Sequence, residues 1–192
     1  MTTQKLAGFD NPQAARDWSR DLQTTTGYRF HVRPARPEDR DAIDAFFARL
    51  TPEDVYFRFL TPLPRLDKWR LEAMTRIDDP RTIDFLASPI GRDDEILASA
   101  MLSADDRFET AELALATRPD IKHRGVSWTL LDHISRYAAS RGIGKLRAIH
   151  SSADHDATAL EREAGFTLSF APDDATVRIA EKSLAPEPLS QE

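Results

Sequence analysis

The segment from Glu112 to Leu131, ELALATRPDIKHRGVSWTLL, constrains the fold of this chain more than any other stretch. Its first part, through Thr117, has the apolar pattern of a β-strand, and its last part has the spacing of a helix. A polar turn at 118–120 and a basic loop containing Gly125 join the two. The first N–H groups of a helix have no partner within it, so this layout predicts an anion-binding site beside a sheet.

The strand in this segment carries one carboxylate in a row of small residues. Because side chains alternate between the faces of a strand, Glu112, Ala114 and Ala116 share one face. The small residues leave room for a ligand to approach Glu112, which makes this carboxylate a candidate base. A solvated strand carboxylate beside an ordinary basic helix start is the alternative interpretation, and the pattern alone leaves both open.

The loop after the turn is basic and sterically open. Lys122, His123 and Arg124 add positive potential there. Gly125 allows close approach of the backbone, and Ser127 is small and has a hydroxyl donor. A helix that begins near Arg124 would place its positive dipole end at the same point. These features favour a phosphate-bearing ligand.

The composition limits the class of protein. A chain of 192 residues with 41% hydrophobic and 30% charged residues suits a globular protein with one core. The absence of cysteine excludes thiolate catalysis, thiolate metal sites and disulfides. The net charge of -6 argues against a nucleic-acid partner, and the apolar runs are too short to predict a membrane span. Since the start, MTTQKLAGFD, lacks the apolar core of a signal peptide, a cytoplasmic protein is predicted.

The order of patterns divides the chain into three parts. Residues 1–27 are predicted to be an N-terminal extension, with a short helix from Asn11 to Leu22 and a linker at 23–27. Residues 28–184 are predicted to form the folded domain, and residues 185–192 a disordered tail. The sequence does not indicate whether the extension docks on the domain.

Helical and strand patterns follow one another within residues 28–184. Apolar residues at helical spacing indicate the helices, and short apolar runs between polar turns indicate the strands. The predicted order is a strand at 28–33, helices at 38–50, 52–60 and 66–77, strands at 82–88, 95–103 and 109–117, a helix of about 15 residues, a strand at 145–151, a helix at 154–164, and strands at 166–170 and 175–180.

Residues 28–184 resemble the GNAT superfamily of N-acetyltransferases. The cofactor loop of that superfamily has the form Gln/Arg-x-x-Gly-x-Gly/Ala between a strand and a helix, and here it reads KHRGVS at 122–127. AGF at 164–166 matches the helix-to-strand ending of the superfamily. Similarity to the GNAT domain of bacterial protein-lysine acetyltransferases lies in RPARPEDRDAIDAFFARLTPEDVYFRF (33–59), IDD (77–79) and AELALATRPD (111–120).

The resemblance implies both a fold and a reaction. The fold would be α/β, with a mixed, mostly antiparallel sheet flanked by helices and splayed strands that hold acetyl-CoA. The reaction would move the acetyl group of acetyl-CoA to a primary amine by direct attack, with a protein lysine as the expected acceptor. A small-molecule amine as acceptor, and a non-catalytic acyl-CoA-binding sensor or interaction module, are the alternatives. The oligomeric state is not predicted.

The resemblance also assigns residues to roles. Glu112 would be the general base, because a lysine amine with an unperturbed pKa of about 10.4 arrives protonated and cannot attack a thioester. The cofactor-binding residues would be Leu115, Ala116 and Thr117 on the strand beside the pantetheine arm, Lys122, His123, Arg124, Gly125, Val126 and Ser127 around the pyrophosphate, and Asp154 before the next helix.

The chain departs from the superfamily pattern at four of its positions. Lys122 replaces Gln or Arg, and Ser127 replaces Gly or Ala. Asp154 stands where many relatives have Asn, and an ionised carboxylate cannot donate hydrogen bonds. The tyrosine that often protonates the departing thiolate would fall at Glu161, and the three tyrosines of the chain lie elsewhere. The general acid is therefore not identified from the sequence.

Two further groups have competing interpretations. His150, Asp154, His155 and Asp156 are interpreted as a polar loop at the mouth of a cleft, because nothing in their spacing fixes a tetrahedral metal set. Arg58 either lines the acceptor side or packs its stem over neighbouring aromatic residues.

Overall fold

An eight-stranded sheet runs through residues 8–184, the part of the chain that the computed structural model describes. Neighbouring strands are antiparallel except for the parallel pair β5 and β6, so the predicted mixed, mostly antiparallel sheet flanked by helices is confirmed. In sheet order the strands are β1 (Arg20–Gln23), β2 (Arg29–Pro34), β3 (Thr82–Ser88), β4 (Ala98–Ala104), β5 (Thr110–Thr117), β6 (Lys145–Ser151), β8 (Asp174–Ser183) and β7 (Thr167–Ala171).

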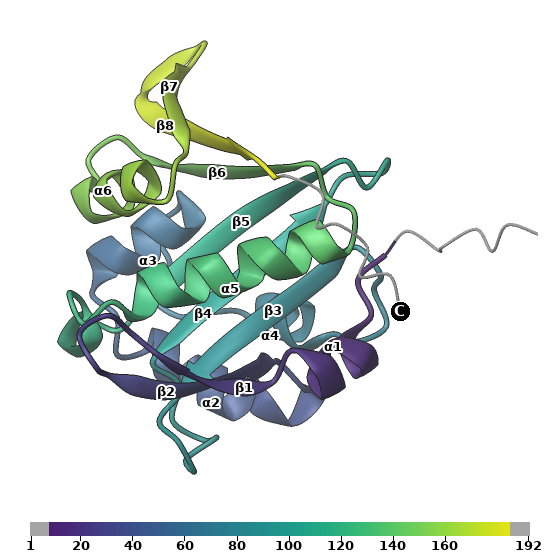
Figure 1. The fold of residues 1–192 in the computed structure, drawn as a ribbon. Helices are drawn as coiled ribbons and strands as arrows, with labels where there is room; N and C mark the ends of the chain where they lie inside the picture. Colours follow the sequence, from purple (N-terminus) through teal and green to yellow (C-terminus); the bar gives the residue numbers. More distant parts are fainter. Residues whose placement is uncertain (1–7, 185–192) are drawn as a thin grey trace, which may run out of the picture.

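Helices cover both faces of this sheet (Figure 1). The longest, α5 (Val126–Ser140), crosses one face, together with α1 (Asn11–Asp17), which packs near β2. The helices α2 (Arg40–Phe47), α3 (Pro52–Phe59) and α4 (Lys68–Thr75) lie on the other face, and α6 (His155–Glu163) follows β6. Short 3-10 turns, η1 (Pro37–Asp39) and η2 (Pro119–Ile121), precede α2 and the loop before α5. No helix within residues 8–184 is long and apolar enough to cross a bilayer.

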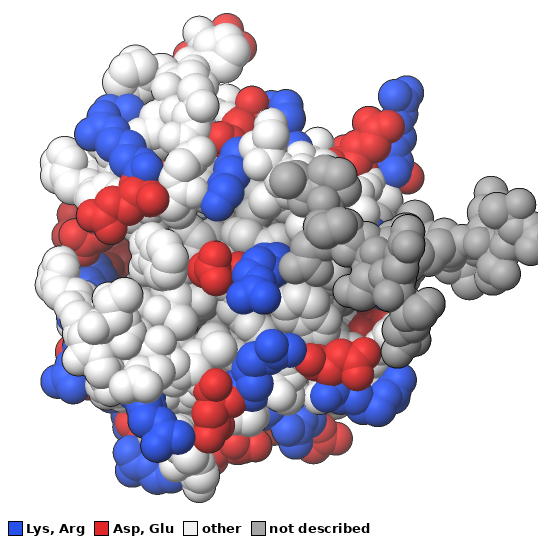
Figure 2. Space-filling view, viewed as in Figure 1, with Lys and Arg blue, Asp and Glu red and all other residues white. Residues whose placement is uncertain are grey.

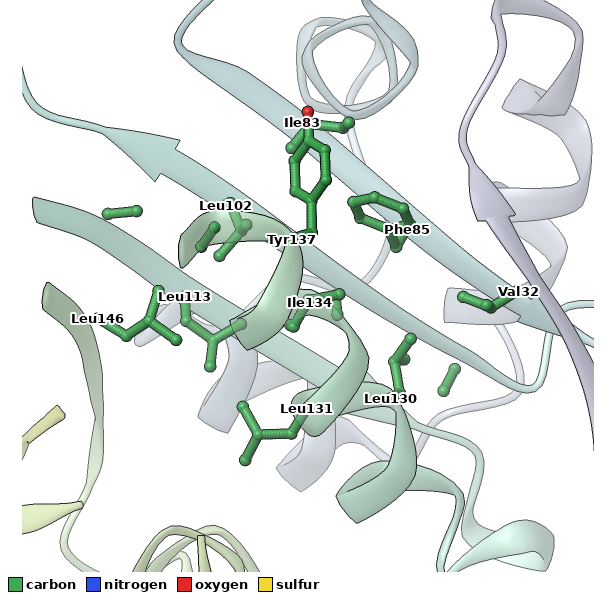
Figure 3. Close-up of a cluster of buried hydrophobic side chains, with 14 of the residues drawn as sticks. Val32, Ile83, Phe85, Leu102, Leu113, Leu130, Leu131, Ile134, Tyr137 and Leu146 are labelled. Carbon is green, nitrogen blue, oxygen red and sulfur yellow. The ribbon is translucent and has the colours of Figure 1, made fainter. Parts of the chain in front are cut away.

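Two apolar clusters hold these layers together. Leu130, Ile134 and Tyr137 lie on one side of α5, as helical spacing requires, and pack onto the sheet (Figure 3). On the other face, Ile43 and Phe46 of α2 belong to a second cluster. Each such buried side chain contributes about 1.5–3 kcal/mol relative to an exposed one. The sheet is thus fixed on both faces and gives its strand ends a rigid frame.

The described part of the N-terminal segment docks on the sheet. The predicted helix reaching Leu22 is wrong in its extent, because α1 ends at Asp17 and β1 pairs with β2 from Arg20 onward. Backbone hydrogen bonds to β2 replace those that a longer helix would have made. The boundary predicted at residue 27 falls in the turn between β1 and β2. The predicted tail at 185–192 lies outside the described residues.

The strands β5 and β6 pair only over their first halves. The register runs from Thr110 opposite Lys145 to Leu113 opposite Ala148, and the pairing stops there. Beyond this point β5 pairs with β4 alone and β6 with β8 alone. The predicted splay is therefore present, and it gives β5 a free edge over residues 114–117.

Candidate functional site

A cavity of about 470 Å³ opens where β5 and β6 separate. Residues 113–117 of β5 and 148–150 of β6 form two of its walls, and α3, α6 and the loop before α5 complete it. The parting of the strands leaves backbone N–H and C=O groups of β5 facing this space without a strand partner. An extended ligand with amide groups could pair with such an edge.

Most of the cofactor-binding residues predicted from the sequence meet at this cavity. Arg124 and Val126 are the exceptions: Arg124 is exposed, with its carbonyl accepting from Thr26 Oγ1 at 2.7 Å, and Val126 is buried in the core under α5. The predicted residues that line the cavity are Leu115, Ala116, Thr117, Lys122, His123, Gly125, Ser127 and Asp154.

The loop before α5 holds a left-handed backbone at two positions. Gly125 has φ of 83° and is the N-cap of α5, and His123 has φ of 63°. A Cβ on Gly125 would lie 3.1 Å from Thr24 Cβ, so both the backbone conformation and the limited space favour glycine. Ser127 Oγ and Thr117 Oγ1, 2.9 Å apart, tie the helix start to the end of β5. Among residues 8–184 no side chain caps α5, which leaves the first N–H groups of this helix for a ligand.

The lysine of the loop is paired with carboxylates. Lys122 Nζ donates to Asp54 Oδ1 at 2.8 Å and to Asp156 Oδ2 at 3.2 Å, which links the loop to α3 and α6. Burial opposes its charge, but these two partners raise the pKa of Lys122. A phosphate near Lys122 would therefore compete with two acidic groups. Figure 2 shows the same mixture on the face covered by α5, where basic and acidic side chains are interspersed.

The structure places Glu112 at the edge of the cavity and not in its lining. It is exposed, opposite Ser103 of β4 and Arg147 of β6. Ala114, two residues further along the same face, does line the cavity. Two strand residues span about 7 Å, so a group in the cavity could reach Glu112 directly or through one water.

A buried carboxyl group lies on the same face of the sheet as Glu112, and the sequence reasoning missed it. Asp84 of β3 is 2% exposed and accepts from Ser99 Oγ at 3.0 and 3.1 Å. Burial raises the pKa of Asp84 to about 7, although the nearby Arg58 guanidinium works in the opposite direction. A lone Asp in the otherwise apolar run TIDFLAS was the signal available in the sequence.

Arg58 of α3 lines the cavity, and Asp84 and Glu112 both lie near enough for their charges to act on it. Its guanidinium carbon lies 4.8 Å from the Phe59 ring centroid, and Nη2 lies 4.0 Å from Met101 Sδ. Burial lowers the pKa of Arg58, while the charges of Asp84 and Glu112 act to raise it. Both interpretations of Arg58 therefore have support, since it packs over an aromatic ring and also faces the cavity.

The wall formed by β6 and α6 presents capping and buried side chains, whereas the loop before α5 presents backbone N–H groups. Asp154 caps α6, accepting from Ala157 N at 2.9 Å. His150 and Glu161 are each 5% exposed and form a pair, with Nδ1 3.3 Å from Oε1. Within residues 8–184, no group of three or more His, Cys, Asp or Glu side chains is arranged to hold a metal ion.

Known proteins match this chain over most of its length. Residues 44–166 match the model of the acetyltransferase (GNAT) family. An acetyltransferase of Pseudomonas aeruginosa is 26% identical over 147 residues, which are 76% of this chain and 78% of that protein.

Solved structures agree with that match. The GNAT domain of PAT from S. lividans has a TM-score of 0.80 at 25% identity, over 87% of this chain and 97% of that one. Spermidine N-acetyltransferase from Vibrio cholerae, solved with CoA and spermine, has a TM-score of 0.66 at 14% identity, over 82% and 96% of the two chains.

Proposed function

The chain belongs to the acetyltransferase (GNAT) family of acetyl-CoA-dependent enzymes, and on this premise we propose how its residues bind acetyl-CoA and which acceptor they serve. The observation that carries the proposal is the position of one cavity between a free strand edge and an uncapped helix start. A long ligand with amides at one end and phosphates at the other suits both features.

Acetyl-CoA lies along the fork between β5 and β6 in this proposal. The amides of its pantetheine arm pair with the backbone of β5 at Leu115 to Thr117, which has no strand partner on that side. Its pyrophosphate lies at the loop from Lys122 to Ser127, where the first N–H groups of α5 and the helix dipole favour negative charge.

Glu112 acts as the general base. It accepts a proton from the incoming ammonium, directly or through one water, and the free amine attacks the thioester carbonyl. A backbone N–H of the β5 edge donates to the oxyanion that forms. The support for Glu112 is its place on the face that Ala114 and Ala116 continue into the cavity.

The acceptor we propose is a protein lysine. The resemblance of residues 33–59 and 111–120 to protein-lysine acetyltransferases supports this choice. The exposed carboxylate of Glu112 supplies negative charge on the face where a cationic amine would approach. A small cationic amine would meet the same charge and is the second candidate. A cytoplasmic location is proposed from the composition alone.

An acceptor screen at fixed acetyl-CoA concentration tests this function. Release of free thiol with a lysine-containing protein or peptide, with one acetyl group added to that lysine by mass spectrometry, supports the proposal. Release with polyamines or amino acids alone moves the function to a small-molecule acceptor. Tight binding of acetyl-CoA without thiol release from any acceptor would support a non-catalytic acyl-CoA-binding module instead.

A further inference from the structure

Arg58 of α3 is a cation in the cavity wall that lacks a carboxylate partner among the described residues. Its side chain is half-buried, and its Nε is buried without a hydrogen-bond partner. The acidic groups Asp84 and Glu112 act on it through their charges and not through hydrogen bonds. Nη2 lies 4.0 Å from Met101 Sδ, and a thioether is a weak acceptor. Most N–H groups of this guanidinium are therefore left for a ligand.

The arginines that the fold buries elsewhere are paired. Arg33 donates twice to Asp39 at 2.7 Å, and Arg118 donates to two carboxylates, each at 2.6 Å. Burial opposes the charge of Arg33, but its carboxylate partners raise its pKa, whereas burial lowers the pKa of Arg58. Because a guanidinium keeps its charge in proteins, Arg58 presents to the cavity a cation that the fold does not neutralise directly.

The two acidic groups near Arg58 do not remove this charge. Asp84 accepts twice from Ser99 Oγ, and burial raises the pKa of Asp84 to about 7. Near pH 7 its carboxyl is therefore ionised in only about half of the molecules. Glu112 is exposed and carries the role of base in the proposed reaction. An anion from a ligand would be the first direct partner of Arg58.

The position of Arg58 indicates which reactant brings that anion. Met101, beside the guanidinium, pairs in register with Ala114 of β5, which also lines the cavity. Thr117, where β5 turns toward the phosphate loop, is three residues further along, a distance of about 10 Å. Glu112 is two residues from Ala114 in the other direction. The phosphates of acetyl-CoA and the guanidinium thus occupy different parts of the cavity, and Arg58 is on the side of the acceptor.

We propose that Arg58 binds a carboxylate of the acceptor and so selects amines that carry an acidic group close by. This inference rests on the proposed function, because it names the class of acceptor used at that same site. Glu112 and Arg58 offer opposite charges to the ammonium and the carboxylate of such an acceptor. In a protein, the carboxylate belongs to an aspartate or glutamate within two positions of the lysine, since one or two extended residues span about 3–7 Å.

The first experiment compares two peptides with the full-length protein and acetyl-CoA. Each peptide has one lysine, flanked by glutamates in one and by glutamines in the other. Wild type should show a kcat/KM about tenfold higher for the glutamate peptide, the size of one charge-assisted hydrogen bond. Arg58→Gln should bring the two peptides within about twofold of each other. Arg58→Lys keeps the charge but not the planar fork, so it should keep part of the preference.

The controls separate recognition of the acceptor from other effects. Arg162→Gln removes the same charge at an exposed position of α6 outside the lining of the cavity, and it should keep the wild-type preference. The Kd of acetyl-CoA for Arg58→Gln should stay within about twofold of wild type. Succinyl-CoA, whose acyl group has its own carboxylate, tests the donor side. If Arg58→Gln loses activity with this donor alone and keeps the peptide preference, the proposal is overturned.

The second experiment identifies the source of the carboxylate. A free amino acid has the same two charged groups as the flanked lysine, and its amide lacks the carboxylate. If wild type prefers the amino acid to its amide and Arg58→Gln does not, the role of Arg58 holds and the acceptor is a small molecule. If neither the peptide pair nor the amino-acid pair shows a preference that depends on Arg58, the proposal is overturned.

Binding measurements distinguish this inference from the function it rests on. If wild type releases no thiol with any acceptor, the proposed function fails, and the same two pairs are titrated into the CoA-bound protein. A carboxylate preference in Kd that Arg58→Gln abolishes still supports the role of Arg58, and equal affinities overturn it. If wild type is active but indifferent to the carboxylate, the proposed function stands and only the role of Arg58 is excluded.

Discussion

Two walls of the cavity are built in different ways. The loop wall comes from consecutive residues, 122–127, and offers backbone N–H groups near the surface. The wall of β6 and α6 brings together His150 and Glu161, which lie on separate elements, and offers buried side chains. The difference indicates that different groups of the protein bind the cofactor and transfer protons. Changes in the loop wall should weaken acetyl-CoA binding, whereas changes in the proton-transfer groups should slow turnover and leave binding intact.

The largest effect is expected from Gly125→Glu in the loop wall. The side chain would lie against Thr24 in a backbone conformation that disfavours it, and its charge would repel the pyrophosphate. Acetyl-CoA at 100 times its dissociation constant should stabilise the folded wild type by about 2.7 kcal/mol and so raise its melting temperature. The melting temperature of Gly125→Glu should not change when acetyl-CoA is added. Gly142→Glu is the control, since Gly142 has φ of 90° with open space around it and should respond as wild type does.

Glu112→Gln should produce the next largest effect, this time on turnover. Removing the proposed base should lower kcat about 100-fold, while the Kd of acetyl-CoA stays within about twofold. Steady-state thiol release measures the first constant, and equilibrium dialysis measures the second. Glu109→Gln, an exposed carboxylate just before β5, should keep wild-type values. Full activity of Glu112→Gln across the pH range would remove Glu112 as the base.

A smaller effect should come from the acidic partners of Lys122. Asp54→Asn removes the carboxylate 2.8 Å from Lys122 Nζ and frees that charge for a phosphate, so acetyl-CoA should bind about threefold tighter at low salt. Asp156→Asn, whose carboxylate is more exposed and 3.2 Å away, should have less effect. Weaker binding in Asp54→Asn would show that the Lys122 bridge positions the loop and does not compete with the ligand.

The buried carboxyl group outside the cavity should alter stability more than catalysis. Burial raises the pKa of Asp84 in the folded protein to about 7 from its ordinary value of 3.8, so the folded state keeps a proton between these values that the unfolded state has lost. Wild-type stability from this group is therefore present below pH 3.8 and is lost as pH rises through 7.

Replacement of Asp84 by Asn tests that pH dependence. The unfolding free energy of Asp84→Asn relative to wild type should increase by about 2–4 kcal/mol between pH 4 and pH 8, because the wild-type carboxyl loses its proton over this range and asparagine has none to lose. Urea unfolding at both pH values measures it. A pH-independent difference would mean that Asp84 ionises normally in the folded protein.

The sequence predicted those features that depend only on residues close together along the chain. The loop KHRGVS, the uncapped start of α5 and the alternation in β5 are local patterns, and the structure places them together. The strand β1 was missed because its hydrogen bonds depend on β2, and Leu22 fits a helix pattern equally well. The His150–Glu161 contact joins two elements, so spacing within either element gave no sign of it.

One measurement tests the separation of cofactor binding from proton transfer most directly. It is the dissociation constant of acetyl-CoA, measured by calorimetry on Gly125→Glu and on Glu112→Gln in one buffer. We predict no measurable binding for Gly125→Glu and a wild-type constant for Glu112→Gln. Wild-type affinity in Gly125→Glu, or lost affinity in a folded Glu112→Gln, would contradict the assignment of binding to the loop and of proton transfer to Glu112.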